Sequence, residues 1–290
     1  MIAAVTGGKG GTGKSFVATN LAVLLARSHS LVLADLDVEA PNDHILLGAE
    51  LEGEEAVKIM FPFIRYEKCI RCRACVNVCD TGAMLASKEG LPYVIPRLCS
   101  GCKSCLFACP TEAIVAGERV IGRTYVTPVS VNGSSFTLVT GVLKEGEEHT
   151  PPVVLAARRR ALSLDAELHL VDTAAGTSNT VSTAMYGAKA AVAVTEPTPL
   201  GLHDLRLILH VLKELEVPRR YVVINRAGIG PAEKHYRVAE EMGAKVVVEI
   251  PYSREVVESY VKGIPIVASN PASEASEALR TVAEALEEAM

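Results

Sequence analysis

Short apolar segments alternate with longer helical patterns along most of the chain. Apolar runs with the length of buried strands occupy residues 2–5, 31–34, 168–171, 191–195, 221–224 and 246–250. Helical patterns at residues 16–27, at 153–164 and up to residue 215 lie between these runs. Strands that alternate with helices form parallel sheets covered on both faces. The pattern therefore predicts an α/β fold with a mostly parallel sheet flanked by helices.

The alternation stops between residues 61 and 118 and resumes after residue 119. Two further strands are expected at residues 125–131 and 135–142, joined by Asn132-Gly133, a strong hairpin signal. We therefore expect a host domain formed by residues 1–60 and 119–290, with residues 61–118 as a separate inserted domain.

The first apolar run ends in a glycine-rich loop, Gly-Lys-Gly-Gly-Thr-Gly-Lys-Ser at residues 8–15, which fits G-x-x-x-x-G-K-[ST]. Its four glycines are expected to allow strained backbone angles, so that successive N–H groups converge on phosphate oxygens. In such a loop Lys14 reaches the β- and γ-phosphates and Ser15 ligates Mg²⁺. The predicted nucleotide contacts here are Gly8, Gly10, Gly11, Thr12, Gly13, Lys14, Ser15 and Phe16.

A second lysine early in this loop, Lys9, makes the segment K-G-G-x-G-K-[ST], which resembles the deviant P-loop of the MinD/ParA ATPase superfamily. The resemblance implies a P-loop NTPase fold and a slow or partner-stimulated ATPase. It also implies that Lys9 acts across a homodimer, on the partner's nucleotide, and that nucleotide drives dimerisation. The alternative is a solvated loop lysine.

Aspartates follow two of the apolar runs. Asp35 and Asp37 follow the second run, and the resemblance makes this D-x-D segment switch I, with Asp37 positioning the attacking water. The alternative is that either aspartate caps the next helix. Asp172 follows residues 168–171 in a D-x-x-x-G segment that ends at Gly176 and resembles switch II; it is expected to hold Mg²⁺ through water. Asn42 also matches the family pattern.

Two later loops are expected beside the base. Asn225 and Arg226 follow one strand, and the family uses an asparagine here against adenine. A GTPase motif would need aspartate at position 228, where this chain has Gly228, so the sequence favours ATP. Pro251 and Tyr252 end the last strand and form the second base-side loop by resemblance.

All eight cysteines lie between residues 69 and 109, in two copies of C-x₂-C-x₂-C-x₃-C that are 30 residues apart. This duplication resembles the bacterial two-cluster ferredoxin, in which the fourth cysteine of each run ligates the other cluster. The resemblance implies two [4Fe-4S] clusters in a small α+β ferredoxin-like insert, although Asp80 stands where the motif usually has proline. The alternatives are two zinc sites and a disulfide framework. Zinc sites fit the cysteine spacing less well, because they more often use separated C-x-x-C pairs. Disulfides are disfavoured in the cytosol. The implied ligand sets are Cys69, Cys72, Cys75 and Cys109 for the first cluster, and Cys99, Cys102, Cys105 and Cys79 for the second.

Composition narrows the classes of partner. The net charge of −5 argues against nucleic-acid binding. No apolar run is long enough to span a bilayer, Met1 leads directly into the first strand, and the C-terminal helix at residues 275–290 has the single cation Arg280. We therefore expect a cytoplasmic protein that binds no membrane. Segment 61–118 carries seven basic and five acidic residues, which is a mildly basic setting for anionic clusters.

The functional hypothesis joins the two signals. The protein is expected to bind ATP and Mg²⁺, to dimerise with itself, and to couple switch movement to electron transfer with an unidentified redox protein or metallocluster acceptor. The alternatives are an ATP-dependent assembly or carrier factor for iron–sulfur or metal cofactors, and a redox sensor. No cysteine lies near residues 172–176 or at the C-terminus, where related dimer-bridging and scaffold proteins carry theirs, and this favours electron transfer.

Overall fold

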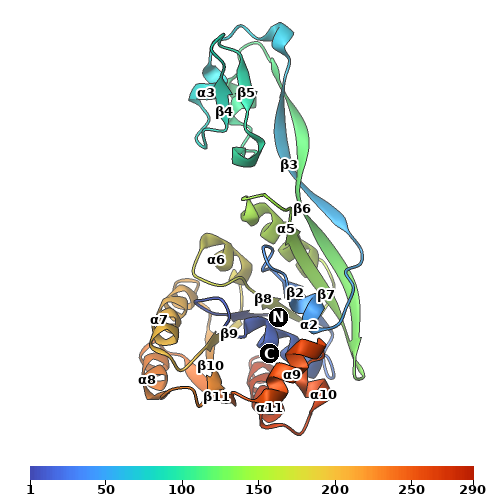
Figure 1. Cartoon of the computed structure of the whole chain (residues 1–290), viewed down its shortest axis with the longest axis vertical. Coiled ribbons are helices and arrows are strands. Elements are labelled where there is room, and N and C mark those ends of the chain that lie inside the picture. Colours follow the sequence, from blue (N-terminus) through green and yellow to red (C-terminus); the bar gives the residue numbers. More distant parts are fainter. The chain divides into compact units, whose positions relative to one another are not determined.

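The computed structural model describes residues 1–290 and divides into two compact units (Figure 1). Unit 1 comprises residues 1–54, 124–142 and 154–290, and unit 2 comprises residues 55–123 and 143–153. The expected insert at residues 61–118 lies inside the range of unit 2, and the division into domains at residues 60 and 119 stays a prediction.

Unit 1 is built on a largely parallel sheet. Its strands follow the order β11-β10-β9-β1-β8-β2-β7-β6, and each pair from β11 to β7 runs parallel. The predicted parallel α/β sheet is therefore confirmed. The strands are β1 (Ile2–Thr6), β2 (Leu31–Asp35), β6 (Ile114–Val131, of which residues 124–131 lie in unit 1), β7 (Ser134–Leu143), β8 (Leu168–Asp172), β9 (Ala190–Thr195), β10 (Arg219–Ala227) and β11 (Lys245–Pro251).

Helices cover both faces of this sheet (Figure 1). Successive residues of the central strand β1 point to opposite faces: Ala3 and Val5 belong to one apolar core, and Ala4 to the other. The first core includes residues of α1, α10 and α11, and the second includes residues of α6, α7 and α8. The helices are α1 (Lys14–Leu25), α2 (Asp43–Leu46), α5 (Thr150–Leu162), α6 (Asn179–Met185), α7 (Pro199–Glu214), α8 (Glu233–Glu241), α9 (Arg254–Lys262), α10 (Ile266–Ser269) and α11 (Glu274–Glu287).

The central position of β1 explains where the glycine-rich loop lies. β1 pairs with β8 on one side, where Val5 is opposite Asp172, and with β9 on the other, where Thr6 is opposite Ala193. The carboxyl ends of these parallel strands therefore meet at one edge of the sheet. Open α/β sheets bind their ligands at this edge.

The predicted hairpin is present but longer than expected. Asn132 and Gly133 both have positive φ, 48° and 84°, as a two-residue turn of the primed type requires. β6, however, begins at Ile114 rather than near residue 125, so the prediction of its start was wrong. Gly117 and the polar residues of its first half weaken the alternation that would have indicated a strand.

Unit 2 contains only short elements apart from its two long strands. β3 (Glu55–Ile64) pairs with β6, and the hairpin of β4 (Met84–Ala86) and β5 (Pro92–Val94) forms a separate antiparallel sheet. Its helical segments are η1 (Tyr66–Lys68), α3 (Ala74–Asn77), η2 (Pro96–Leu98) and α4 (Ser104–Ala108). Its buried apolar cluster consists of Cys75, Met84 and Ile114, with further cysteines packed around it. So small a core supplies little stability by itself.

Candidate nucleotide site and cysteine sites

The glycine-rich loop connects β1 to α1 and is strained at two glycines. Gly11 has a φ of 79° and Gly13 one of 95°, in the left-handed region that glycine adopts without steric cost. Gly8 and Gly10 do not have positive φ, so the expectation of strained angles at all four glycines was wrong for these two. Gly8 is needed for a different reason: a Cβ there would lie 2.4 Å from the backbone oxygen of Asp204.

Asn225 holds this loop from the end of β10. Its Nδ2 donates a buried hydrogen bond of 2.8 Å to the Thr12 carbonyl oxygen, and its Oδ1 accepts one of 2.9 Å from the Arg226 N–H. A Cβ on Gly13 would approach Asn225 Nδ2 to 2.2 Å, so glycine is the residue that permits this contact. In this structure both ends of the Asn225 amide are therefore used to fix backbone.

The two lysines of the loop have different partners. Lys14 is buried, and its Nζ donates to the Lys9 carbonyl oxygen at 3.3 Å. Lys9 extends the other way and forms a 3.0 Å ion pair with Glu196, which also pairs with the Arg226 guanidinium. Glu196, at the end of β9, was not a predicted site residue, because a glutamate before Pro197 has the pattern of an ordinary loop.

Carboxylates gather beside the loop at the ends of β2 and β8. Asp172 is fully buried, and its Oδ2 accepts a 2.6 Å hydrogen bond from the Ser15 hydroxyl. Burial raises the pKa of Asp172 to about 7, against the opposing effects of the Ser15 hydroxyl and the Lys14 ammonium. Asp37 lies nearby, half-buried, and burial raises its pKa as well.

Asp35 has a structural role that fits the capping alternative. Its Oδ2 accepts hydrogen bonds of 3.0 and 3.2 Å from the N–H groups of Asn42 and Asp43, where α2 begins. Asp43, which was not predicted, is fully buried beside it, and neither of its carboxylate oxygens has a partner. Burial and the neighbouring carboxylate raise the pKa of Asp43 well above its usual value.

These groups fit a magnesium ion by their chemistry. Ligand oxygens of Asp35, Asp43 and Asp172 lie within 4.8 Å of one another, and Asp172 Oδ1 has no hydrogen-bond partner. Oxygen ligands of this kind are those that Mg²⁺ prefers. Asp172 belongs to this group and Ser15 contacts it, so both are placed where they could hold the ion, and their metal-binding role stays a prediction.

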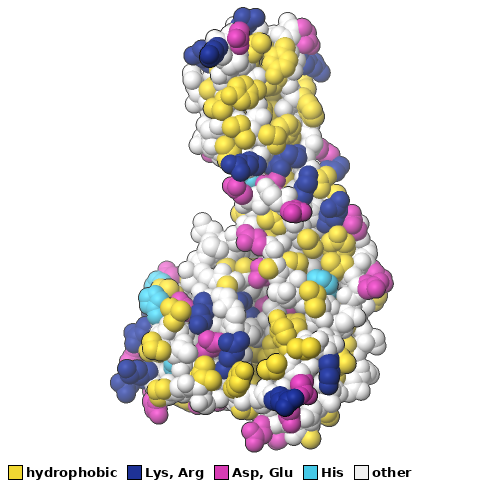
Figure 2. All heavy atoms as spheres, viewed as in Figure 1, with side chains coloured by type: hydrophobic (Ala, Val, Ile, Leu, Met, Phe, Trp, Pro, Cys, Tyr) yellow, Lys and Arg dark blue, Asp and Glu magenta, His cyan; other side chains and the backbone are white.

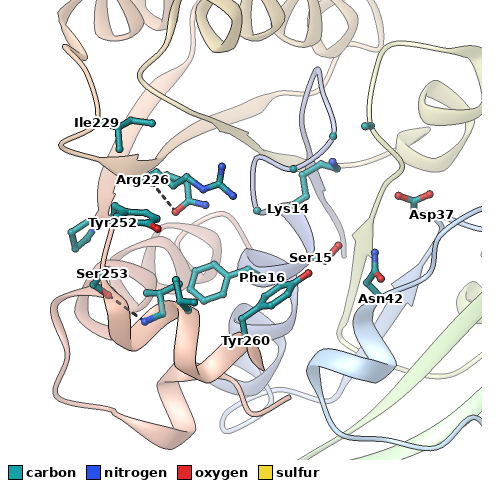
Figure 3. Close-up of a pocket in the computed structure, with 18 residues that line it drawn as sticks. Lys14, Ser15, Phe16, Asp37, Asn42, Arg226, Ile229, Tyr252, Ser253 and Tyr260 are labelled. Carbon is teal, nitrogen blue, oxygen red and sulfur yellow. Dashed lines mark hydrogen bonds between the residues drawn. The ribbon is translucent and has the colours of Figure 1, made fainter. Parts of the chain in front are cut away.

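A cavity of about 590 Å³ opens at this edge of unit 1 (Figure 3). Figure 3 shows Lys14, Ser15 and Asp37 at one end of the cavity and Arg226, Ile229 and Tyr252 at the other. The residues that line it are Gly10, Gly11, Gly13, Lys14, Ser15, Phe16, Asp37, Asn42, Ala175, Asn225, Arg226, Ile229, Pro251, Tyr252, Ser253, Val256, Val257 and Tyr260. The volume and the change from polar to apolar lining suit a nucleotide.

The structure brings most of the predicted nucleotide residues to this cavity. The predicted residues outside its lining are Gly8, Lys9, Thr12 and Asp172. Sequence reasoning missed the apolar wall that α9 contributes, with Val256, Val257 and Tyr260. The hydrophobic spacing of residues 254–262 could have indicated that helix.

The cysteines of unit 2 form two sets. One small cavity is lined by Cys69, Cys72, Cys75 and Cys109, and a second by Cys79, Cys99, Cys102 and Cys105. These are the two ligand sets implied by the resemblance, including the exchange of the fourth cysteine between the copies. Four thiols at this spacing around one cavity fit a [4Fe-4S] cluster.

Backbone conformation and hydrogen bonds suit such groups. Arg71 and Arg73 in the first cysteine loop, and Gly101 and Lys103 in the second, all have φ between 61° and 74°, so both loops curve in the same way. The N–H of Ala113 donates to Cys109 Sγ at 3.2 Å, and that of Met84 to Cys79 Sγ at 3.4 Å. Hydrogen bonding between Cys102 and the side chain and backbone of Ser104 lowers the pKa of the Cys102 thiol. Burial and the neighbouring thiols raise the pKa of Cys105 to about 11.

Comparison with known proteins identifies the nucleotide-binding part. The sequence model of the CobQ/CobB/MinD/ParA nucleotide binding domain family matches residues 3–266. An uncharacterised protein of Methanocaldococcus jannaschii is 37% identical over 264 residues, covering 91% of this chain and 90% of the relative. A protein of Aquifex aeolicus named iron-sulfur cluster carrier protein is 27% identical over 304 residues, covering 98% of this chain and 66% of the relative.

The fold is shared with a solved structure. The septum site-determining protein MinD of Pyrococcus horikoshii, complexed with Mg-ADP, is 19% identical and superposes with a TM-score of 0.60, covering 99% of this chain and 96% of MinD. No helix of the present structure has the length and apolar character needed to cross a membrane.

Proposed function

Because the chain belongs to the CobQ/CobB/MinD/ParA nucleotide-binding family, we propose that this MinD/ParA-like ATPase uses its nucleotide state to control electron transfer through two [4Fe-4S] clusters. ATP and Mg²⁺ would occupy the cavity at the edge of the unit 1 sheet. The clusters would be held by the two cysteine sets of unit 2, with Cys109 completing the first set and Cys79 the second. The clusters, when bound, supply one-electron redox chemistry.

One observation carries this proposal: each set of four cysteines lines a cavity of its own, in the crossed arrangement of a two-cluster ferredoxin. Zinc sites do not require that exchange between the two runs. The eight thiols are all used by the two sets, which leaves none for transferring a cluster to another protein. Clusters that are each held by four cysteines are expected to stay bound, and this favours electron transfer over delivery of a cluster to another protein.

The roles within the nucleotide site follow from its geometry. Lys14 and the loop N–H groups would bind the phosphates, and Ser15 and Asp172 the metal ion. Asp37 would position the attacking water, and loss of the γ-phosphate would free the loops that contain Asp37 and Gly176. Lys9 would leave Glu196 and reach the nucleotide of a second copy of the chain, which makes the active form a homodimer.

An anaerobic redox titration monitored by EPR tests the proposal. The protein as purified should contain about eight irons and two reducible cubanes per chain. The midpoint potentials should differ between the ADP form and the form with a non-hydrolysable ATP analogue; a difference of about 60 mV corresponds to tenfold coupling for a one-electron couple. Equal potentials, together with electron delivery that is indifferent to nucleotide, would refute nucleotide control.

A second candidate function has its own support. The Aquifex aeolicus relative is named as an iron–sulfur cluster carrier, which favours an ATP-dependent carrier or assembly factor. In that case clusters should leave the protein when ATP is added and appear in an apo-ferredoxin present in the same solution. A redox sensor, the third possibility, would instead show nucleotide-dependent dimerisation that changes with the oxidation state of the clusters.

A further inference from the structure

The first cysteine loop (residues 69–75) keeps an arginine where its copy has glycine. Arg71 has a φ of 61°, and the equivalent residue of the second loop, 30 positions later, is Gly101 with a φ of 74°. A left-handed conformation is sterically costly for a residue with a Cβ, and glycine avoids this cost. Arg73 also has a φ of 61°, and its counterpart Lys103 has one of 69°. Arg71 is therefore the position at which the first loop alone places a guanidinium group on strained backbone.

The surface of the first loop differs from that of the second. Ile70 is 63% exposed between two cysteines, whereas its counterpart in the second loop is Ser100. The thiols of Cys72 and of its counterpart Cys102 are both exposed, but Cys72 has an exposed arginine on each side, Arg71 and Arg73, whereas Cys102 has the one neighbouring cation Lys103. The face of unit 2 drawn in Figure 2 shows hydrophobic side chains over a broad area with Lys and Arg side chains at its margins.

The architecture of unit 2 makes little use of the two arginines. Arg71 donates one long hydrogen bond, 3.4 Å, to the Glu89 carbonyl oxygen, and Arg73 has no side-chain hydrogen bond or ion pair. Buried structural arginines normally have several partners. Cations that surround an exposed apolar side chain beside a cluster ligand instead have the composition of a protein-docking surface.

We propose that the first cysteine loop, through Ile70, Arg71 and Arg73, is the docking site for an acidic electron-transfer protein. The inference rests on the proposed function, because the electron would pass to the cluster held by Cys69, Cys72, Cys75 and Cys109. The reduced partner would give up one electron and be oxidised, and the cluster that these four cysteines would hold would accept that electron.

Charge decides the class of the partner. Lys68, Arg71 and Arg73 outnumber the exposed acids Glu67 and Glu89 there, so the loop region keeps a net positive charge, which attracts an acidic protein and speeds its association. Nucleic acid fits less well, because the exposed Ile70 lies among these cations and offers an apolar contact that a phosphate backbone cannot use.

The experiment uses an acidic flavodoxin as the probe, with its flavin hydroquinone as electron donor. The hydroquinone anion gives up one electron and becomes the neutral semiquinone, while one cluster is reduced. Stopped-flow kinetics of the complete, cluster-loaded protein follow the semiquinone absorbance. The test variant is Arg71→Gly/Arg73→Ser, and the matched control, Arg97→Ser/Lys103→Ser, removes two exposed cations beside the second cysteine loop.

At low ionic strength the test variant should associate with flavodoxin about tenfold more slowly than the wild type. The control should stay within about twofold, because the general charge of the protein changes equally in both. At about 1 M salt, where the Debye length is about 3 Å, the difference should disappear. Ile70→Ser should speed dissociation of the complex at every salt concentration, because apolar contact is not screened.

Several results would overturn the inference. An equal decrease of the association rate in the test and control variants would mean that only the net charge of the protein matters. An unchanged association rate in the test variant would place the docking site elsewhere. Binding of a single-stranded oligonucleotide that disappears in the test variant while flavodoxin exchange persists would assign the surface to nucleic acid.

Two measurements separate this inference from the proposed function. Iron content and the EPR signals of each variant are recorded first; a wild type without clusters refutes the proposed function, whereas clusters without docking refute the inference alone. Arg71→Gly on its own restores the residue of the second loop and should raise the unfolding temperature or leave it unchanged. It therefore provides a folded variant if the double substitution loses a cluster.

Discussion

The contact between Asn225 and the glycine-rich loop gives a sharp test of the nucleotide site. The Asn225→Ala substitution removes the 2.8 Å hydrogen bond to the Thr12 carbonyl oxygen and the 2.9 Å bond from the Arg226 N–H. We expect the loop that binds phosphate to lose its preferred conformation. The Asn225→Asp variant keeps the shape and the bond from Arg226, but a carboxylate cannot donate to Thr12.

The magnitude follows from the burial of this contact. A buried polar group left without its partner costs about 1–3 kcal/mol. If that cost falls on the phosphate-binding conformation, nucleotide affinity should decrease about 5- to 150-fold. Asn225→Asp should lose at least as much, because its negative charge faces the carbonyl oxygen and approaches the site of the phosphates.

The assay compares two ligands by isothermal titration calorimetry with Mg²⁺. One is ATP, and the other is inorganic tripolyphosphate, which has no base. If Asn225 acts through the loop, as its hydrogen bonds indicate, the affinities for both ligands should decrease by the same factor. If Asn225 instead contacts adenine, as the family resemblance implies, the affinity for ATP should decrease while the affinity for tripolyphosphate stays unchanged. That second pattern would refute the reasoning from the structure.

Three further predictions concern other contacts. The Glu196→Gln substitution removes the ion pair that holds Lys9. The dimerisation constant in the presence of an ATP analogue, measured by analytical ultracentrifugation, should therefore increase about 2- to 10-fold. Weaker dimerisation would contradict this and would mean that Glu196 orients Lys9 for contact with the partner. The Glu147 side chain is buried, which opposes ionisation, but hydrogen bonds from Arg119 and His149 lower its pKa from 4.5 to about 2. The ionised Glu147 therefore stabilises the folded protein by about 3 kcal/mol. This stabilisation is complete above pH 4.5 and should be lost as the pH falls towards 2. Equal acid unfolding curves for the wild type and Glu147→Gln would contradict this assignment. Removing iron by a chelator under oxidising conditions should increase amide exchange throughout unit 2 and leave ATP binding intact; protected amides in the iron-free unit 2 would show that its small apolar core suffices.

The parallel core was predictable because its signals are local. Residues 31–34 are a continuous apolar run and are buried on both faces as the run implies, whereas residues 246–249 of β11, at the edge of the sheet, are only partly buried. The loop at residues 8–15 and the cysteine runs combine residue type with fixed spacing, which few alternative folds satisfy. The turn at Asn132-Gly133 is equally local and was located correctly.

The contacts that the sequence could not predict join distant segments. Glu196 meets Lys9 across 187 positions, and Asp204 approaches Gly8 because α7 packs beside the loop. The helix α9 brings Tyr260 to the cavity from a short, polar segment whose own periodicity is easily overlooked. In each case the interaction depends on how the sheet orders its strands, which residue patterns alone do not specify.

The position of β1 in the sheet also affects synthesis of the protein. β1 is translated before both of its neighbours, residues 169–172 of β8 and 190–193 of β9. The glycine-rich loop therefore has no sheet to support it until about two thirds of the chain has been translated. The cysteine segment, complete at Cys109, emerges well before that point. Both cysteine runs are thus present on the nascent chain before the strands that support the nucleotide-binding loop have been made.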